Sequence, residues 1–328
     1  MTMDANGAAP LIRLRGLTKR FGDLTAVDHL DLDVMPGQVF GFLGPNGAGK
    51  TTTIGMMLGL IKPTSGSVEV FGMDAHRNRA EVMRRVGAII ETPAFYPYLS
   101  ARDNLRLVAQ YGGRGKSQID EVLEVVGLGR RAEDKVKTYS TGMNQRLGLA
   151  SVLLGEPDLI MLDEPTVGLD PAGAREVWDL ARSMATDHGR TVFMSSHLLN
   201  EIQQTCDRVA IINRGRTLLQ GDLDQLLTGA TGVYFEVDRP EDAIEILAGA
   251  GVTASVDSTA CTVWAEVGAE RAGELNAVLV SAGLLVSGLG SRKSDLESVF
   301  LEVTQDDDVQ KREHPSSSSE LQERARLE

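Results

Sequence analysis

The sequence predicts an α/β fold, in which a domain built around a mostly parallel sheet precedes a smaller α+β domain. An apolar strand over residues 39–43 runs into a glycine-rich loop, and residues 51–60 after the loop have helical spacing. Strand and helix patterns alternate from there to about Gly221, which is typical of a mostly parallel sheet. Residues 233–304 then follow a strand and helix order of their own.

Length and charge limit the class of protein. At 328 residues the chain is long for one domain, which favours two domains and a tail. The 33 Lys and Arg against 46 Asp and Glu give a net charge of −13. Because binding to nucleic acids depends on Lys and Arg that neutralise phosphates, we expect no nucleic-acid partner.

Cysteines and apolar runs bear on where the chain works. Cys206 and Cys261 match no metal-binding spacing, so we expect two reduced thiols of a cytosolic protein. Residues 1–10 carry no Lys or Arg ahead of an apolar stretch, and the sequence has no run of about 18 apolar residues. We therefore expect neither a secretory signal nor a membrane span, so that a partner supplies any membrane-spanning part.

The pattern along the chain predicts the domain boundaries. We expect a flexible start over residues 1–10, a main domain over 11–228 and an accessory domain over 229–304. Residues 305–328 are polar and Ser-rich and lack aromatic side chains, which predicts a disordered tail.

Elements outside the parallel sheet are also predicted. Residues 11–36 should form short strands joined by a turn, because apolar and polar residues alternate over 30–34. The accessory domain should follow the order βαββαβ and then α, which is that of a ferredoxin-like unit. Its expected elements are a strand at 233–237, a helix from Pro240, strands near 252–256 and at 262–267, a helix at 269–282, a strand at 284–289 and a last helix from Ser294.

The segment from Gly44 to Thr51, GPNGAGKT, fits the phosphate-binding loop pattern between a strand and a helix. Glycines let backbone N–H groups approach phosphates, and the helix N-terminus adds a partial positive charge. Lys50 should reach the β- and γ-phosphates, and Thr51 should offer its hydroxyl to Mg²⁺. A tight turn without a ligand is the alternative, but the Lys-Thr pair and the flanking elements argue against it. The residues expected to bind the nucleotide here are Gly44, Pro45, Asn46, Gly47, Ala48, Gly49, Lys50, Thr51 and Thr52.

An apolar run over residues 159–162 ends in Asp163 and Glu164. The carboxyl end of a buried parallel strand presents such side chains to the ligand crevice of the sheet. Asp163 is the expected partner of Mg²⁺, through water, and Glu164 is placed to accept a proton from the attacking water. Strands often end in solvated acids, which is the alternative, but the preceding phosphate loop favours the catalytic interpretation. The two motifs predict a nucleoside triphosphatase.

The stretch 139–146, YSTGMNQR, indicates the family of this nucleoside triphosphatase. It resembles the signature of the ATP-binding-cassette (ABC) family, which is LSGGQ followed by a basic-rich QR. Ser140, Gly142, Gln145 and Arg146 match that signature, whereas Tyr139, Thr141 and Met143 depart from it. Ser140 supplies a hydroxyl and Gly142 a bare backbone at a helix start, which would form a second anion-binding corner. Alone, the Ser-Thr-Gly segment could be only a helix cap.

Three further residues follow the order of the family. Asp170, in Gly168-Leu169-Asp170, stands at the family's D-loop, and His197 closes an apolar strand like the switch histidine. The resemblance implies that His197 contacts the γ-phosphate and the attacking water, although a lone His at a strand end is usually structural. Phe21 stands where the family has an aromatic side chain that stacks on adenine; a core Phe is the alternative.

Glu91 is a departure, because most relatives have a glutamine at this point after an apolar strand, here residues 86–90. Its position suggests a side-chain oxygen directed at Mg²⁺ and the attacking water. A solvated acid at the start of a loop is the alternative.

The resemblance covers roughly residues 11–225. It implies the fold of an ABC ATPase, with an antiparallel β subdomain and a helical subdomain beside the mostly parallel sheet. It also implies ATP and Mg²⁺ as ligands, and a head-to-tail dimer with a second copy or a paralogue. Further implications are a membrane permease whose cytoplasmic helix docks near residues 96–111, and a place on the cytoplasmic face of the membrane.

Three segments, ETPAFYPYLSARDNL, YSTGM and SDLESVFLEVT, resemble the ATPase subunits of bacterial exporters, including the bacitracin-resistance type. The expected function is therefore ATP hydrolysis that drives export of drugs, antibiotics, peptides or lipids. One alternative is an importer ATPase, but the strand and helix pattern after Val233 differs from the β-barrel domain usual there. Another is a soluble cassette protein, which typically has two cassettes or a long coiled-coil insertion.

Overall fold

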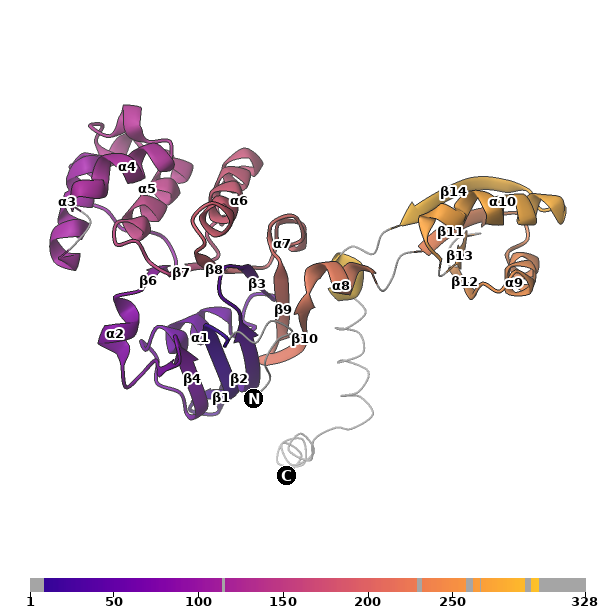
Figure 1. The fold of residues 1–328 in the computed structure, drawn as a ribbon, viewed down its shortest axis with the longest axis horizontal. Helices are drawn as coiled ribbons and strands as arrows, with labels where there is room; N and C mark the ends of the chain where they lie inside the picture. The colour runs from indigo at the N-terminus through magenta and orange to yellow at the C-terminus, as the bar shows by residue number, and fades with distance from the viewer. Residues whose placement is uncertain are drawn as a thin grey trace, which may run out of the picture. The chain divides into compact units, whose positions relative to one another are not determined.

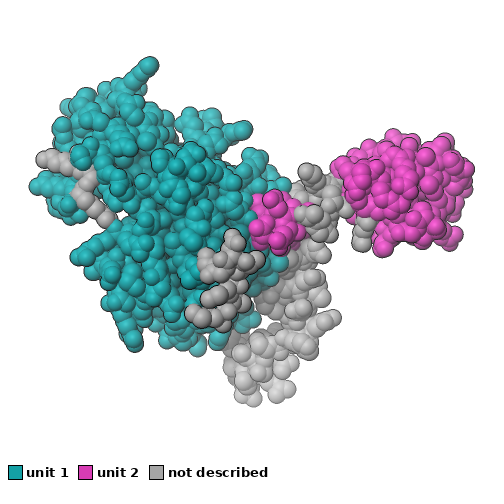
Figure 2. All heavy atoms as spheres, in the orientation of Figure 1, with its two compact units in different colours: residues 1–221 teal, residues 222–328 magenta. Residues whose placement is uncertain are grey.

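The computed structural model describes residues 9–113, 116–228, 232–257, 262–265, 267–292 and 296–300. It divides into two compact units, residues 1–221 and 222–328 (Figure 2). Most of the expected flexible start and the whole of the expected tail lie outside the described residues, as does Cys261.

A six-stranded sheet of order β10-β9-β3-β8-β7-β6 forms the centre of the first unit (Figure 1). Strand β3 pairs in parallel with β8 and β9, and β7 pairs in parallel with β6 and β8, which confirms the mostly parallel sheet. All residues of β3 and β7 are buried, as expected for strands covered on both faces. The strands are β3 (Val39–Leu43), β6 (Val86–Ile89), β7 (Leu159–Asp163), β8 (Thr191–Ser196), β9 (Arg208–Asn213) and β10 (Arg216–Asp222).

A second sheet, of order β2-β1-β4-β5, contains the strands expected in residues 11–36. Strand β1 pairs with β2 and β4, and β4 pairs with β5, all antiparallel. These strands are β1 (Ile12–Phe21), β2 (Leu24–Val34), β4 (Ser65–Val70) and β5 (Met73–Asp74). They correspond to the antiparallel β subdomain that the resemblance implies.

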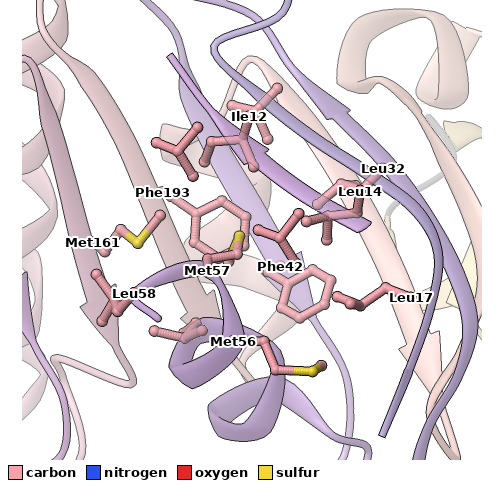
Figure 3. Close-up of a cluster of buried hydrophobic side chains, with 14 of the residues drawn as sticks. Ile12, Leu14, Leu17, Leu32, Phe42, Met56, Met57, Leu58, Met161 and Phe193 are labelled. Atoms are coloured by element: carbon pink, nitrogen blue, oxygen red, sulfur yellow. The ribbon is translucent and has the colours of Figure 1, made fainter. Parts of the chain in front are cut away.

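One apolar core joins the two sheets through helix α1 (Lys50–Met57) (Figure 3). Met56 and Met57 of α1 belong to the same buried cluster as Leu14 of the antiparallel sheet and Phe42 and Phe193 of the parallel sheet. The helix after the phosphate loop is therefore fixed by burial on both sides.

Helices α3, α4 and α5 pack on one another and form a helical group (Figure 1). Besides α1, the described helices of the first unit are α2 (Arg79–Met83), α3 (Ala101–Gly112), α4 (Ile119–Val125), α5 (Thr141–Leu153), α6 (Pro171–Thr186) and α7 (Leu199–Thr205), with 3₁₀ turns at Lys116–Gln118, Gly129–Arg131 and Val136–Thr138. Across the described part of the chain, no helix has both the length and the apolar character needed to cross a bilayer.

The second unit contains a four-stranded sheet of order β12-β13-β11-β14, with antiparallel neighbours throughout. Its elements follow the βαββαβ order expected from the sequence, and residues 296–300 are helical. They are α8 (Leu223–Thr228), β11 (Gly232–Val237), α9 (Pro240–Gly249), β12 (Ala254–Asp257), β13 (Thr262–Ala265), a 3₁₀ turn (Ala269–Arg271), α10 (Ala272–Ser281) and β14 (Val286–Arg292). Strand β13 ends two residues before the expected position, and β14 begins two residues after it.

Candidate active site

The glycine-rich loop connects β3 to α1, and its last residue, Gly49, has a φ of 103°. A Cβ at Gly49 would lie 2.5 Å from the carbonyl oxygen of Ala26, so both the backbone conformation and the close approach require glycine. The first residues of α1, Lys50, Thr51 and Thr52, line the pocket described below, and the first N–H groups of a helix have no partner within the helix.

Lys50 is buried and fully engaged. Its ammonium donates to the carbonyl oxygens of Gly44 at 2.6 Å and Pro45 at 3.1 Å, and forms an ion pair with Oε1 of Glu164 at 2.9 Å. Because an ammonium has three hydrogens, all of its donors are used. A phosphate that binds Lys50 must therefore displace at least one of these partners.

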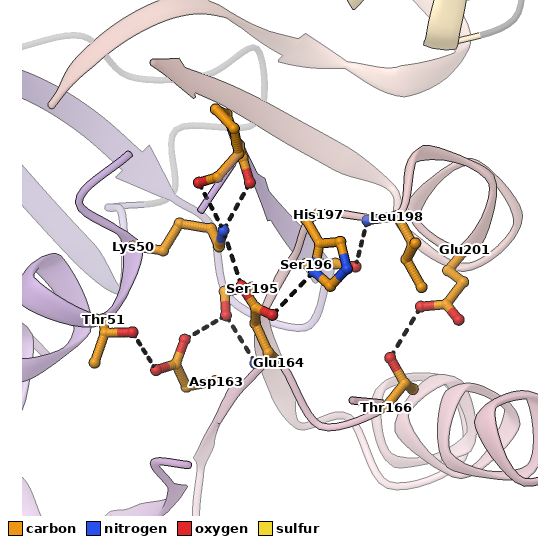
Figure 4. A network of polar contacts seen from close by, with 12 residues as sticks. Lys50, Thr51, Asp163, Glu164, Thr166, Ser195, Ser196, His197, Leu198 and Glu201 are labelled. Carbon is orange, nitrogen blue, oxygen red and sulfur yellow. Dashed lines mark hydrogen bonds and ion pairs between the residues drawn. The ribbon is translucent and has the colours of Figure 1, made fainter. Parts of the chain in front are cut away.

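Asp163, the last residue of β7, is held by the neighbouring strand β8 and by helix α1 at the carboxyl edge of the parallel sheet (Figure 4). Its Oδ2 accepts a hydrogen bond from the hydroxyl of Thr51 at 2.7 Å, and its Oδ1 accepts one from the hydroxyl of Ser195 at 2.5 Å. Asp163 and Ser195 are pairing partners in the β7–β8 register, so the sheet itself brings them together. The result is a cluster of oxygen atoms fixed beside the phosphate loop.

Glu164 follows β7 with a φ of 45°, a left-handed conformation that is unfavourable for residues other than glycine. Its backbone N–H donates to the hydroxyl of Ser195 at 2.9 Å, which helps to hold this conformation. The side chain then lies between Lys50 and His197, with Oε2 2.9 Å from Nδ1 of His197 (Figure 4). Strain of this kind often accompanies functional sites.

Partial burial raises the pKa of Glu164, but the hydrogen bond and charge of Lys50, together with His197, outweigh it. The pKa of Glu164 therefore lies below its ordinary value, and the carboxylate is ionised at neutral pH.

A pocket extends from this cluster along the phosphate loop to the β1–β2 hairpin. Phe21 is half-exposed at its far end, and the ammonium of Lys19 lies 4.7 Å from the centre of the Phe21 ring. The lining residues are Phe21, Leu24, Ala26, Asn46, Gly47, Gly49, Lys50, Thr51, Thr52 and Glu164. Gly44, Pro45 and Ala48 do not line it, and the first two act here through carbonyl groups that hold Lys50.

Ser140, Gly142 and Asp170 also do not line this pocket. Ser140 caps α5 by accepting a hydrogen bond from the N–H of Met143 at 3.2 Å, and Asp170 caps α6 by accepting one from Gly173 at 3.1 Å. A Cβ at Gly142 would have nothing nearer than 3.9 Å, so packing within the chain does not require this glycine.

Glu91 follows β6 in the way that Glu164 follows β7, since Ile89 pairs with Leu162 in the register. It too has a positive φ, of 61°. Its side chain is exposed, makes no hydrogen bond or ion pair with another described residue, and does not line the pocket. Thr51 and Asp163 therefore meet without Glu91.

Sequence reasoning missed two features of the site. Ser195, which binds both Asp163 and Glu164, belongs to none of the motifs found in the sequence. Strand pairing is the signal that could have found it. Leu24 and Ala26 line the pocket because their strand pairs with that of Phe21, a hairpin contact that individual motifs do not indicate.

The phosphate loop, the buried Lys50 and the acids at the end of β7 define a phosphate-loop nucleoside triphosphatase. The family model for ABC transporters matches residues 27–167. The chain is 50% identical over 217 residues to the bacitracin transport ATP-binding protein BcrA of Bacillus licheniformis, covering 66% of this chain and 71% of that protein. It therefore belongs to the ABC transporter family, as an ATP-binding subunit that hydrolyses ATP, which confirms the resemblance seen in the sequence.

Two further comparisons extend this result. The daunorubicin resistance ATP-binding protein DrrA3 of Streptomyces coeruleorubidus is 36% identical over 305 residues, covering 90% of this chain and 96% of that protein, so the similarity includes the second unit. The dimeric structure of MJ0796, a bacterial ABC transporter cassette, has a TM-score of 0.58 at 25% identity and covers 65% of this chain and 98% of that one. Cassettes of this family work as dimers.

Proposed function

We propose that this chain is the ATPase of an exporter, in which two copies, or one copy and a paralogue, drive a separate membrane-spanning permease from its cytoplasmic face. The observation that carries the proposal is the meeting of Lys50, Asp163, Glu164 and His197 at one edge of the sheet. The similarity to BcrA, a bacitracin transport protein, and to DrrA3, a daunorubicin resistance protein, supports a drug or an antibiotic as the exported compound, within the wider class of drugs, antibiotics, peptides and lipids.

In this proposal the phosphate loop binds ATP with its backbone N–H groups and Lys50, while Phe21 stacks on the base. The γ-phosphate displaces the carboxylate of Glu164 from Lys50, because the ammonium has no donor to spare and the carboxylate is the one partner whose negative charge repels the phosphate. Glu164 is then free to turn toward water. Binding of the substrate and release of the catalytic base are thus one event.

The residues fit a magnesium ion. The hydroxyl of Thr51 and the carboxylate of Asp163 already lie within 2.7 Å of each other, and oxygen atoms are the ligands that Mg²⁺ prefers. When bound, Mg²⁺ would neutralise charge on the β- and γ-phosphates. Ser195 fixes Asp163 from the other side, and Glu91 would add a carboxylate at the same edge.

Glu164 accepts a proton from the water that attacks the γ-phosphate, and its carboxylate is already ionised when ATP arrives. His197 holds the second carboxylate oxygen at 2.9 Å and orients it. Both side chains come from strand ends that the β7–β8 pairing fixes.

Ser140, Gly142 and Asp170 would complete the site of the opposite subunit. Their absence from the lining of the pocket in this chain supports a contribution from a partner, and the open space at Gly142 leaves room for a phosphate. Residues 11–228 would form this ATPase domain and residues 229–304 an accessory domain, followed by the tail over 305–328.

Export is tested in the host cell. Deletion of the gene should increase sensitivity to at least one member of a panel of antibiotics and peptides, and raise the amount of that compound retained by the cells. The wild-type gene should reverse both effects, whereas Glu164→Gln should not. Loss of uptake rather than loss of efflux would identify an importer, and recovery of the protein with ribosomes instead of solubilised membranes would rule out the transporter.

A further inference from the structure

The four-stranded sheet of the second unit has two different faces. Val233, Phe235 and Val263 point to one face, where they share a buried core with Leu247 of α9 and Leu279 of α10. Side chains alternate along each strand, so the residues between these point to the opposite face. Helices α9 and α10 pack on the first face, not on that opposite face. The second face includes residues of β11, β13 and β14.

Tyr234 and Trp264 lie next to each other on the second face. They are pairing partners in the β11–β13 register, and side chains of antiparallel partners stand about 5 Å apart at their Cβ atoms. Both side chains are partly exposed. Two aromatic side chains thus stand on neighbouring strands in the middle of the sheet.

Each ring lies over a glycine of the next strand. A Cβ at Gly232 would lie 2.2 Å from two ring atoms of Trp264, and a Cβ at Gly290 would lie 2.5 Å from the ring of Tyr234. Neither glycine has a positive φ, so the missing side chain rather than backbone freedom is what matters. The rings therefore rest on the backbone of the neighbouring strands and turn their other sides outward.

An acidic side chain lies on the same face, beside Tyr234. Glu236 is two residues from Tyr234 on the same face and is exposed, and a Cβ at Gly288 would lie 2.5 Å from its Oε2. Among the described residues, the carboxylate of Glu236 has no hydrogen-bond or ion-pair partner. We call Tyr234, Glu236 and Trp264 the aromatic platform.

We propose that the aromatic platform binds a planar aromatic molecule that carries a positive charge. Flat rings with outward faces stack on planar ligands, and a cation gains from both the π-systems and the carboxylate of Glu236. An anionic ligand such as a nucleic acid is disfavoured by that carboxylate and by the net charge of −13. The accessory domain would then respond to an organic cation at a site separate from the ATP pocket.

Trp264 itself reports binding, because the chain has two tryptophans and the other, Trp178, is buried in the first unit. In full-length Trp178→Phe protein without nucleotide, N-methylacridinium should quench the emission of Trp264 in a saturable manner. Acridine, which has nearly the same size but is neutral at pH 8, should bind about threefold or more weakly. Excess ATP with Mg²⁺ should not displace either probe.

Substitutions test the geometry, all in the Trp178→Phe background and each with its far-UV circular dichroism checked. Tyr234→Leu should weaken binding about tenfold, as expected for loss of one stacking partner. Gly290→Ala should weaken it by displacing the ring of Tyr234, whereas Gly273→Ala, whose Cβ meets no atom within 4 Å, should not. Glu236→Gln should remove the preference for the cation but keep acridine binding.

Three results would overturn the proposal. One is the lack of saturable quenching, and another is equal affinity for both probes in the unsubstituted platform. The third is shielding of Trp264 from acrylamide that increases with protein concentration, which would show that a second copy covers the face. None of these results depends on ATP hydrolysis, so they leave the proposed transport function untouched.

Discussion

Replacing the proposed base while keeping its shape tests the chemistry most sharply. Glu164→Gln retains an oxygen that can accept from Lys50, at the 2.9 Å seen here, but it cannot take a proton from water. A general base contributes about 10²–10⁴ to a rate, so turnover should fall at least about 100-fold. In free energy this is about 3 kcal/mol or more of lost transition-state stabilisation.

The affinity of Glu164→Gln for ATP should rise although its turnover falls, because Glu164 and the phosphates compete for Lys50. The Lys50–Glu164 pair is mostly buried on the lysine side and partly exposed on the glutamate side. If the pair contributes about 1 kcal/mol, neutralising Glu164 should tighten ATP binding by up to about fivefold. The variant should also accumulate as an ATP-bound dimer on size exclusion.

The contribution of Glu164 to the stability of the fold should depend on pH in a defined direction. Lys50 and His197 hold the pKa of Glu164 in the folded protein below its ordinary value. The ion pair therefore stabilises the fold fully at pH values above the ordinary pKa of a glutamate. This stabilisation is lost as the pH falls through the lowered pKa of the folded protein. The melting temperatures of wild type and Glu164→Gln should therefore differ from neutral pH down to about pH 5 and converge at lower pH.

Steady-state phosphate release and equilibrium binding of a fluorescent ATP analogue measure the two effects. Glu81→Gln is a matched control, because Glu81 is an exposed acid on α2 outside the pocket. Near-normal turnover in Glu164→Gln would refute its assignment as the base. Weaker rather than equal or tighter ATP binding would refute the competition for Lys50.

Three other predictions concern different parts of the chain. Glu91→Gln should keep ATPase activity but need more Mg²⁺ to reach it, and superimposable titrations would leave Glu91 without a metal role. A chain ending near Gly229 should fold and bind ATP, because the described residues of the buried cluster around α1 all precede that point; an unfolded circular dichroism spectrum would contradict this. Burial raises the pKa of the Cys206 thiol, so in a Cys261→Ser protein a thiol reagent should react only after unfolding, and rapid reaction of the folded protein would disprove it.

The parts of the site that lie close together in the sequence were predictable. Glycines, lysine and threonine in the phosphate loop carry their own geometric reason, and an apolar run that ends in Asp163 and Glu164 places both acids at a sheet edge. Contacts that depend on strand pairing were not. Ser195 meets Asp163 only because β7 and β8 are in parallel register, and the ion pair of Lys50 with Glu164 joins two separate motifs.

The second unit shows the same limit. Alternation along the sequence predicted its strands and their order, but not which strands would be neighbours. The aromatic platform exists because β11 lies between β13 and β14, which puts Tyr234 beside Trp264 and over Gly290. Ends of elements also shifted by a few residues, since local packing decides where a strand stops.

The central claim is that ATP is hydrolysed between two subunits, and mixing two inactive variants tests it directly. Ser140→Arg should block the signature surface and leave the phosphate loop intact, whereas Lys50→Ala should do the reverse. Each variant alone should be inactive. An equal mixture should recover about a quarter of the wild-type rate, because half of the dimers are mixed and each of these has one complete site. A mixture as inactive as its components, or normal activity of Ser140→Arg alone, would contradict the account.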